Sequence, residues 1–154
     1  MSKQEIYNIL YQFNGRESVL DVGCGSTGHP KGVHWTGIDL EIGGLDWYDF
    51  NPDRYDVIIA NDIFPNVDQR LELFLEMYLP RCVEMRLSLT YFDFPKWYRV
   101  KRVDGDEILT MLQWSKKQVL DALNGYTALS IVEYEGEFEN RRSVLLVSLK
   151  GGLK

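Results

Sequence analysis

The pattern of hydrophobic and polar positions divides the chain into helix-like and strand-like segments. Near the start, Ser2 to Glu5 has the form of a capping box, and Asn14-Gly15 provides a helix stop. Between them apolar residues recur at helical spacing, namely Ile6, Ile9, Leu10 and Phe13. The pattern predicts a leading helix with one apolar stripe that packs on a sheet.

Short apolar runs dominate the next part of the chain and predict four strands. They are Val19 to Val22, Val33 to Ile38, Leu45 to Tyr48 and Tyr55 to Ala60. The last run is continuous and β-branched, as in sheets that are covered on both faces. The segment from Ser26 to Gly32 contains Gly28 and Pro30, so at most one turn of helix fits between the first two strands.

The second half continues the alternation of helix and strand. Asp68 can cap a helix that ends at Pro80 and whose apolar stripe is Leu71, Phe74, Leu75 and Tyr78. Residues 83 to 91 alternate apolar and polar side chains, which predicts a strand with one polar face that includes Glu84, Arg86, Ser88 and Thr90.

An inserted hairpin and a terminal hairpin complete the expected elements. Two extended runs between Phe92 and Gln113 flank Asp104-Gly105, a strong hairpin signal. Ser115 to Gln118 is a second capping box and starts a helix that stops at Gly125. The final strands are expected at Thr127 to Glu133 and Arg142 to Leu149.

Composition narrows the class of protein. The 154 residues, of which 45% are hydrophobic, suffice for one domain, expected to span residues 1–154. The formal charge of -6 disfavours a general nucleic-acid binder. Cys24 and Cys82 are too few for a disulfide framework, and no Cys/His group has zinc spacing, so no metal site is expected. Because Met1 to Phe13 lacks a long apolar run, we expect a soluble, cytoplasmic protein without a membrane anchor.

Candidate chemistry gathers where the predicted parallel strands end. A glycine turn, Gly23 to Gly28, follows the first strand, and Asp39 ends the second. Open α/β sheets bind ligands at the carboxyl edge of their strands, and glycines let backbone approach a ligand closely. Asp39 is placed to accept hydrogen bonds from a pair of hydroxyls. Asn61-Asp62 ends the buried fourth strand at the same edge.

These motifs resemble those of the class I S-adenosylmethionine (SAM) dependent methyltransferases. The resemblance covers roughly residues 18 to 150 and rests on Val19 to Gly25 as the glycine motif, Gly37-Ile38-Asp39, Tyr55 to Asp62 and the terminal hairpin. It implies an α/β fold with a Rossmann-like, mostly parallel sheet and an antiparallel C-terminal strand. Helices after the first strands are expected to be shortened, and the hairpin at 92–113 to be inserted before the last helix.

The resemblance also implies a set of residues that bind SAM. The backbone of Gly23 and Gly25 would lie against the methionine portion, and Asp21 would orient its ammonium group. At the nucleoside end of SAM, Asp39 would hold the ribose hydroxyls and Leu40 would pack near the adenine. Asp49-Phe50 would bind the adenine edge, with Asp46 as the fallback. Asn61 and Asp62 would flank the sulfonium.

The acceptor side is less determined by the sequence. Asp62 is the candidate catalytic residue, although it could equally cap the loop before Pro65. Phe64, Tyr91 and Trp97 are the candidates for contacting the substrate. An aromatic substrate wall or lid could be built from Tyr91, Phe92, Phe94, Trp97 and Tyr98, which could equally be the core of the inserted hairpin. His29 could act as a base or lie in a solvent-exposed loop.

We therefore expect an enzyme that transfers a methyl group from SAM to a small molecule or glycan, and the acidic charge leaves a protein substrate open as well. Two alternatives stay open. One is a catalytically reduced SAM-binding partner subunit, because shortened helices would leave apolar sheet surface bare and favour a homodimer or a partner. The other is an NAD(P)-dependent oxidoreductase, because Gly23-x-Gly25-x-x-Gly28 formally matches the dinucleotide fingerprint.

Overall fold

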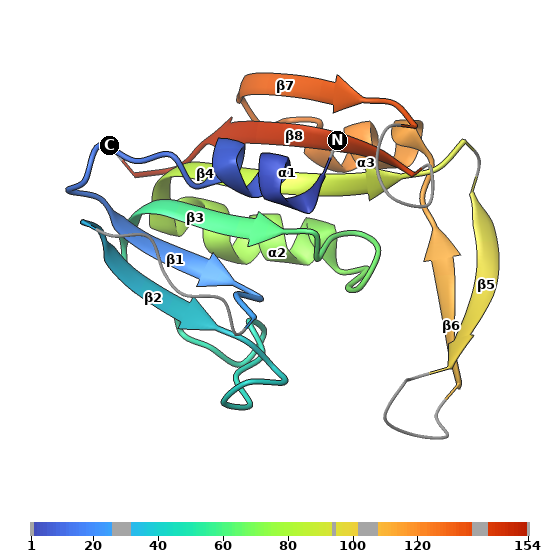
Figure 1. Ribbon diagram of the computed structural model, residues 1–154, viewed down its shortest axis with the longest axis horizontal. Coiled ribbons are helices and arrows are strands. Elements are labelled where there is room, and N and C mark those ends of the chain that lie inside the picture. The colour runs from blue at the N-terminus through green and yellow to red at the C-terminus, as the bar shows by residue number, and fades with distance from the viewer. Residues whose placement is uncertain (1, 26–31, 94, 102–107, 137–141, 154) are drawn as a thin grey trace.

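A six-stranded sheet in the order β2-β1-β3-β4-β8-β7 forms the centre of the computed structural model, which describes residues 2–25, 32–93, 95–101, 108–136 and 142–153 (Figure 1). The strands are β1 (Ser18–Val22), β2 (His34–Ile38), β3 (Tyr55–Asn61), β4 (Cys82–Tyr91), β7 (Ala128–Tyr134) and β8 (Ser143–Lys150). The first four run parallel, β8 is antiparallel to β4, and β7 is antiparallel to β8. The predicted Rossmann-like α/β sheet with its terminal hairpin is confirmed.

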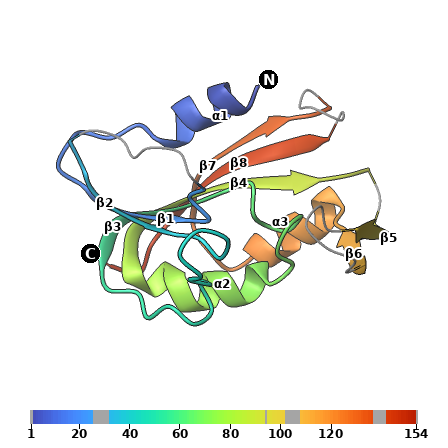
Figure 2. The ribbon, with the colours of Figure 1, turned by 60° about the horizontal axis from the view of Figure 1, so that its bottom comes forward.

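Helices cover the two faces of the sheet unequally (Figure 2). α1 (Lys3–Leu10) lies on one face, while α2 (Leu71–Tyr78), a 3₁₀ turn (Leu79–Arg81) and α3 (Lys116–Leu123) lie on the other. The capping boxes predicted at Ser2 and Ser115 are confirmed. Asp68 does not cap α2: its carboxylate accepts the Arg70 backbone N–H at 2.9 Å, and Arg70 is the N-cap.

The strand predicted at Leu45 to Tyr48 is wrong, because Leu45 and Asp46 belong to no regular element and a turn begins at Trp47. Trp47 explains the difference. Its ring is only 4% exposed and packs edge-on against Phe64 and Phe74. Its carbonyl accepts the Tyr78 hydroxyl at 2.5 Å. An apolar run that anchors a connection into the core leaves the same sequence pattern as a short strand.

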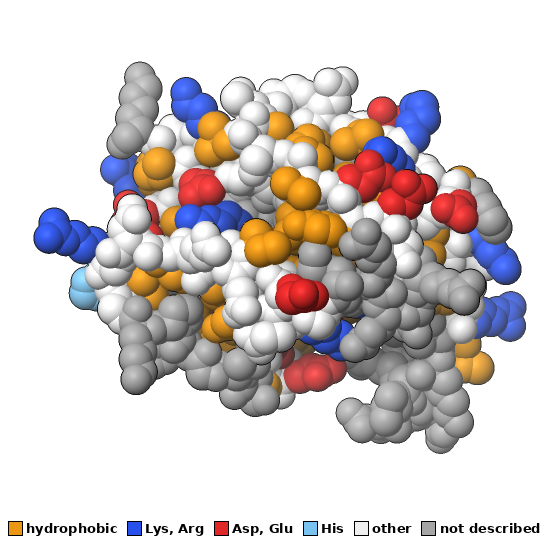
Figure 3. Space-filling model, turned by 45° about the horizontal axis from the view of Figure 1, so that its top comes forward, with side chains coloured by type: hydrophobic (Ala, Val, Ile, Leu, Met, Phe, Trp, Pro, Cys, Tyr) orange, Lys and Arg blue, Asp and Glu red, His pale blue; other side chains and the backbone are white. Residues whose placement is uncertain are grey.

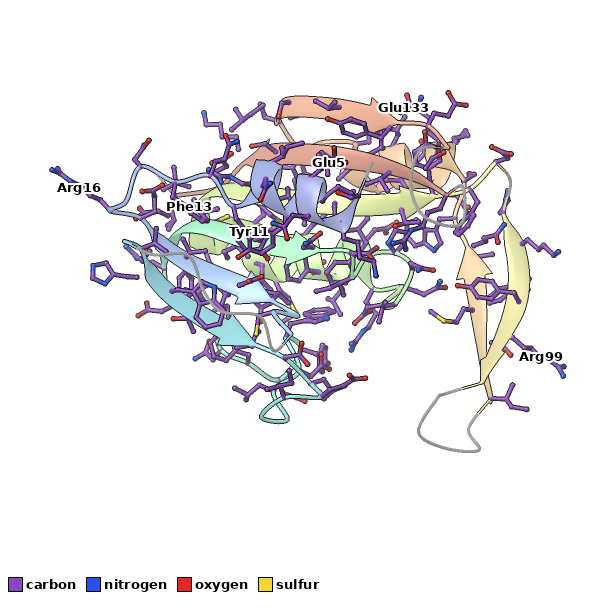
Figure 4. The ribbon with its side chains drawn as sticks, viewed as in Figure 1. Glu5, Tyr11, Phe13, Arg16, Arg99 and Glu133 are labelled. Carbon is purple, nitrogen blue, oxygen red and sulfur yellow. The ribbon has the colours of Figure 1, made fainter. Side chains whose placement is uncertain are left out.

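Large side chains take the place of helices beside β1 and β3 on the α1 face. Val19, Val57 and Ile59 form a buried cluster there, and the partly buried side chains packed against it are Tyr11, Phe13, Val33 and Trp35. In Figure 4 the side chains of Tyr11 and Phe13 lie between the chain around α1 and these strands. No helix lies between β2 and β3, and of the segment from Ser26 to Gly32 all but Gly32 is outside the described residues. The expected shortening of the helices after the first strands agrees with this architecture.

The inserted hairpin is confirmed as a separate two-stranded arm, formed by β5 (Lys96–Lys101) and β6 (Ile108–Gln113). It stands away from the end of the central sheet (Figure 1). The predicted Asp104-Gly105 turn lies outside the described residues. The Tyr98 hydroxyl donates to Asn66 at 3.0 Å, and the Gln69 side chain both donates to the Leu112 carbonyl and accepts its N–H. The arm is therefore attached to the loop that follows β3.

Candidate active site

A cavity of about 650 Å³ opens at the carboxyl ends of β1, β2 and β3. Five of the residues selected from the sequence line it: Gly23, Asp39, Leu40, Asn61 and Asp62. They come from three strand ends that are adjacent because β1 pairs with both β2 and β3. This volume lies in the range of small-molecule and cofactor sites.

The glycine turn after β1 has the backbone conformation that glycine alone adopts easily. Gly23 and Gly25 have φ values of +69° and +65°. A Cβ on Gly23 would collide with the Ile63 side chain, whereas a Cβ on Gly25 would meet nothing within 4 Å. Among the described residues, the space beside Gly25 is therefore open to a ligand, although Gly25 itself is not among the residues that line the cavity.

Asp39 connects the loop after β1 with the loop after β2 through hydrogen bonds to their backbone. Its Oδ2 accepts the Gly25 N–H at 2.8 Å, and its Oδ1 accepts the N–H groups of Glu41 and Ile42 at 2.9 and 3.3 Å. A carboxylate has about four acceptor sites, so these bonds leave room for a further donor. Asp39 thus holds the glycine turn beside the loop after β2.

Asp21 lies beneath the turn and is buried, with 4% of its surface exposed. The Tyr11 hydroxyl donates to its Oδ1 at 2.7 Å. Burial raises the pKa of Asp21 to about 6, although hydrogen bonds from the side chains of Tyr11 and Trp35 oppose the shift. Asp21 is not among the residues that line the cavity.

A network of hydrogen bonds fixes the turn after β3. Asp62 has a φ of +58°, unusual for a residue with a side chain, and its N–H donates to the Ser88 hydroxyl at 2.7 Å. Ser88 donates to Asn61 Oδ1 at 2.7 Å. Thr90 donates to Asp62 Oδ1 at 3.2 Å, and Arg142 donates to Asp62 Oδ2 at 2.9 Å. Both carboxylate oxygens of Asp62 are therefore held in place.

At the end of the cavity where the adenine is expected, the residues predicted from sequence do not line the wall, but a nearby residue does. Asp49 and Phe50 do not line it; their N–H groups both donate to the Asp46 carbonyl at 3.1 Å. Asp46, the fallback, does line the cavity, as do Trp47 and Arg70. The Arg70 guanidinium lies 4.6 Å above the Trp47 ring and bonds to Asp68 at 2.7 Å. Burial acts to raise the pKa of Asp68, but hydrogen bonds from Arg70 and Trp47, together with the Arg70 charge, outweigh it and lower that pKa.

The three aromatic residues expected at the substrate do not meet in this structure. Phe64 is fully buried and stacks on Phe74 in the core, so it offers no surface to a ligand. Tyr91 is 4% exposed, and its hydroxyl donates to Glu133. Burial is the main cause and this bond the second cause that raise the pKa of Tyr91 to about 12. Trp97 is 65% exposed on the arm.

Sequence reasoning missed the residues that support Asp62. Ser88 and Thr90 are each 2% exposed, and their place on the polar face of an alternating strand was the available signal. Arg142 carries no comparable local signal, because its partner lies 80 residues earlier. Trp47 was hidden by the interpretation of 45–48 as a strand. Arg70 lies at the cavity through tertiary contacts with the Trp47 ring and Asp68.

Comparison with solved structures places the fold. Coclaurine N-methyltransferase, solved with N-methylheliamine and S-adenosylhomocysteine (SAH), matches with a TM-score of 0.62 and 15% identity over 86% of this chain and 51% of that chain. The Burkholderia thailandensis 1,6-didemethyltoxoflavin-N1-methyltransferase, with its substrate and SAH bound, gives 0.57 and 14% over 97% and 77%. A glycopeptide N-methyltransferase complexed with SAH gives 0.55 and 11% over 97% and 86%.

The chain therefore has the fold of class I SAM-dependent methyltransferases. It spans about half the length of the coclaurine enzyme that it matches. No protein-family model and no curated protein sequence matches it. Within the described residues, no helix is both long and apolar enough to cross a membrane.

Proposed function

We propose that this chain is a SAM-dependent methyltransferase that acts on a small molecule or glycan. One observation carries the proposal: five residues predicted from the methyltransferase motifs line a single cavity at the carboxyl edge of a methyltransferase-like sheet. The solved structures of similar fold that contain SAH support the choice of cofactor.

The described residues fit this cofactor. The open backbone at Gly25 would receive the methionine portion, with Gly23 beside it. Asp39 retains acceptor capacity for the ribose hydroxyls, and Leu40, 58% exposed, would cover the adenine. Asp46 replaces Asp49 as the carboxylate proposed at the adenine edge, because only Asp46 lines the cavity. The bound cofactor supplies an electrophilic methyl group.

Asp62 and Asn61 would orient the acceptor toward that methyl group. Methyl transfer is an in-line displacement, so alignment supplies much of the rate acceleration. The bonds from Thr90 and Arg142 fix the Asp62 carboxylate, whose side chain is 36% exposed. A fixed, exposed carboxylate can accept a hydrogen bond from an acceptor hydroxyl or amine.

A cytoplasmic location is also proposed. Cys24 and Cys82 are both free, and Cys82 is buried, so the described residues contain no disulfide. Free cysteines are typical of proteins in a reducing compartment.

Calorimetric titration with SAH tests the cofactor site. Asp39→Asn should weaken SAH binding about tenfold or more, because it removes a charged acceptor from the ribose. Asp53→Asn is the matched control, since Asp53 is an exposed aspartate outside the cavity lining. Asp46→Asn should weaken binding while Asp49→Asn should not. Binding of NAD but not SAH would contradict the proposal.

Turnover requires a second measurement. Radiolabelled methyl transfer from SAM to fractionated small-molecule and glycan extracts should label at least one fraction. Asp62→Asn should lower the rate and leave SAH affinity within about threefold, because it alters acceptor alignment. SAH binding without labelling of any fraction would favour the alternative of a reduced partner subunit.

A further inference from the structure

A second, smaller cavity adjoins the cavity proposed for SAM, which we call the cofactor cavity. Asn61 and Asp62 line both of them. The rest of the smaller wall comes from α1, β4 and β8, through Lys3, Ile6, Ser88 and Val144. None of these four residues lines the cofactor cavity. The smaller space, called the α1 cavity below, is therefore a separate site that shares one wall with the cofactor.

The size of the α1 cavity limits what it can hold. Its volume of about 90 Å³ is well below the roughly 300–1,000 Å³ of a pocket that encloses a drug-sized ligand. Ile6 and Val144, which are 3% and 2% exposed, bound it with apolar surface. The α1 cavity therefore has room for one or two functional groups on a short carbon skeleton.

Two hydrogen-bond donors of the α1 cavity have no partner among the described residues. The Lys3 side chain forms neither a hydrogen bond nor an ion pair with them. Asn61 accepts the Ser88 hydroxyl at its Oδ1, but its side-chain NH₂ donates to none of them. Ser88 is engaged, since it also accepts the Asp62 N–H. The groups left for a ligand are an ammonium and an amide NH₂, both of which bind oxyanions.

The charges around the α1 cavity also favour an anion beside Lys3. The Asp62 carboxylate is already paired with Arg142 at 2.9 Å. The acid of α1, Glu5, takes part in the capping box, where it accepts the Ser2 N–H. Acidic and basic side chains are interspersed on the face that carries α1 (Figure 3), so the positive charge of Lys3 is local and does not belong to a basic surface.

We propose that the α1 cavity binds the methyl acceptor and that this acceptor is a small acid with an amine or hydroxyl group, an inference that rests on the proposed methyltransferase function. The anionic group lies between the Lys3 ammonium and the Asn61 amide. The amine or hydroxyl donates to Asp62, which also lines the cofactor cavity. Lys3 and Asp62 form no ion pair with each other, so a ligand can lie between them.

Binding of small acids to the SAH-saturated protein tests the site without turnover. NMR titrations with glycine, β-alanine, glycolate and lactate give the dissociation constants, and the primary amide of each acid is the uncharged probe. At least one acid should bind, and its amide should bind at least about tenfold more weakly. Lys3→Gln should weaken the acid about tenfold, whereas Lys3→Arg should keep its affinity within about threefold, because arginine retains the positive charge.

Lys117→Gln is the matched control, because the Lys117 side chain is 84% exposed in the first turn of α3 and lines neither cavity. It should change the affinity for the acid by less than about twofold. Lys3→Gln should leave SAH affinity within about twofold, since Lys3 does not line the cofactor cavity. Binding of no acid, equal binding of acid and amide, or an unchanged acid affinity in Lys3→Gln would each overturn the proposal.

Methyl transfer to extract distinguishes this proposal from the proposed function. The labelled product should be retained by anion exchange at strongly alkaline pH, where an amine is uncharged and an acid group is not. Labelling only of molecules that are not retained would leave the methyltransferase function standing and refute the acidic acceptor. Acid binding that depends on Lys3, in a protein that labels no fraction, would support the binding site and contradict the enzyme activity.

Discussion

Asp21 shows how one buried carboxyl can oppose stability at neutral pH. Its folded-state pKa of about 6 exceeds the ordinary value of 3.8, so the folded protein holds a proton that the unfolded chain has released between these values. Stability contributed by this proton is fully present below about pH 3.8 and is lost as the pH rises through 6. Above pH 6 a charged carboxylate lies in a poorly solvated position.

Replacing Asp21 with Asn should therefore stabilise the protein at neutral pH. The amide oxygen can still accept the Tyr11 hydroxyl, but it has no charge to desolvate. The gain should be at most about 3 kcal/mol near neutral pH and should shrink toward zero in acid. Urea unfolding across this pH range measures it. Equal pH dependence in the two proteins would show that another group is responsible.

At the scale of elements, the turn that replaces a third strand depends on one anchor. Trp47 is buried among aromatic rings, and its indole N–H donates to Asp68 at 2.9 Å. The same side chain forms part of the cavity wall. Core packing and the shape of the cavity are therefore joined at this residue.

Trp47→Ala should cost about 3–5 kcal/mol of unfolding free energy, the usual range for removing a buried aromatic side chain. Trp97→Ala offers a comparison with the same chemical change on a side chain that is 65% exposed, and it should change stability by less than about 0.5 kcal/mol. Urea denaturation gives both values. Similar losses at the two sites would mean that Trp47 is not the anchor described above.

The elements that could be predicted from sequence are those whose signals are local. The capping boxes at Ser2 and Ser115 contain both partners within four residues, and the arm has a local hairpin signal at Asp104-Gly105. The turn at Trp47 could not be predicted, because its conformation is set by Phe64, Phe74 and Tyr78. Tertiary packing there outweighs the local apolar pattern.

The candidate site divides in the same way. Gly23, Asp39 and Asn61 could be found because strand ends in a parallel sheet meet at one edge. Phe64 was misplaced because an aromatic residue beside a strand end has the same sequence pattern whether it faces a ligand or the core. Asp46 lines the cavity and Asp49 does not. The turn at Trp47 decides which of the two carboxylates lies there, and the sequence did not predict that turn.

At the scale of the whole molecule, the cavity and the β7 edge lie toward opposite ends of the strand order. Ile131 on β7 is 45% exposed, and β4 and β8 separate its strand from β3. Ile131→Lys should therefore bind SAH with the affinity of the wild type, within about twofold. Calorimetry of both proteins measures this, and a clearly weaker affinity of the variant would show that β7 is coupled to the cavity.

The bond between Arg142 and Asp62 has a consequence for how the protein is made. Asp62 leaves the ribosome 80 residues before the side chain that holds its Oδ2. Ser88 and Thr90 follow Asp62 sooner, on a strand that pairs with β3. During synthesis the first four strands can assemble while the Asp62 carboxylate still lacks its arginine. The nascent chain can thus form the parallel part of its sheet early, but the Asp62 network is complete only after Arg142, the residue before β8, has been translated.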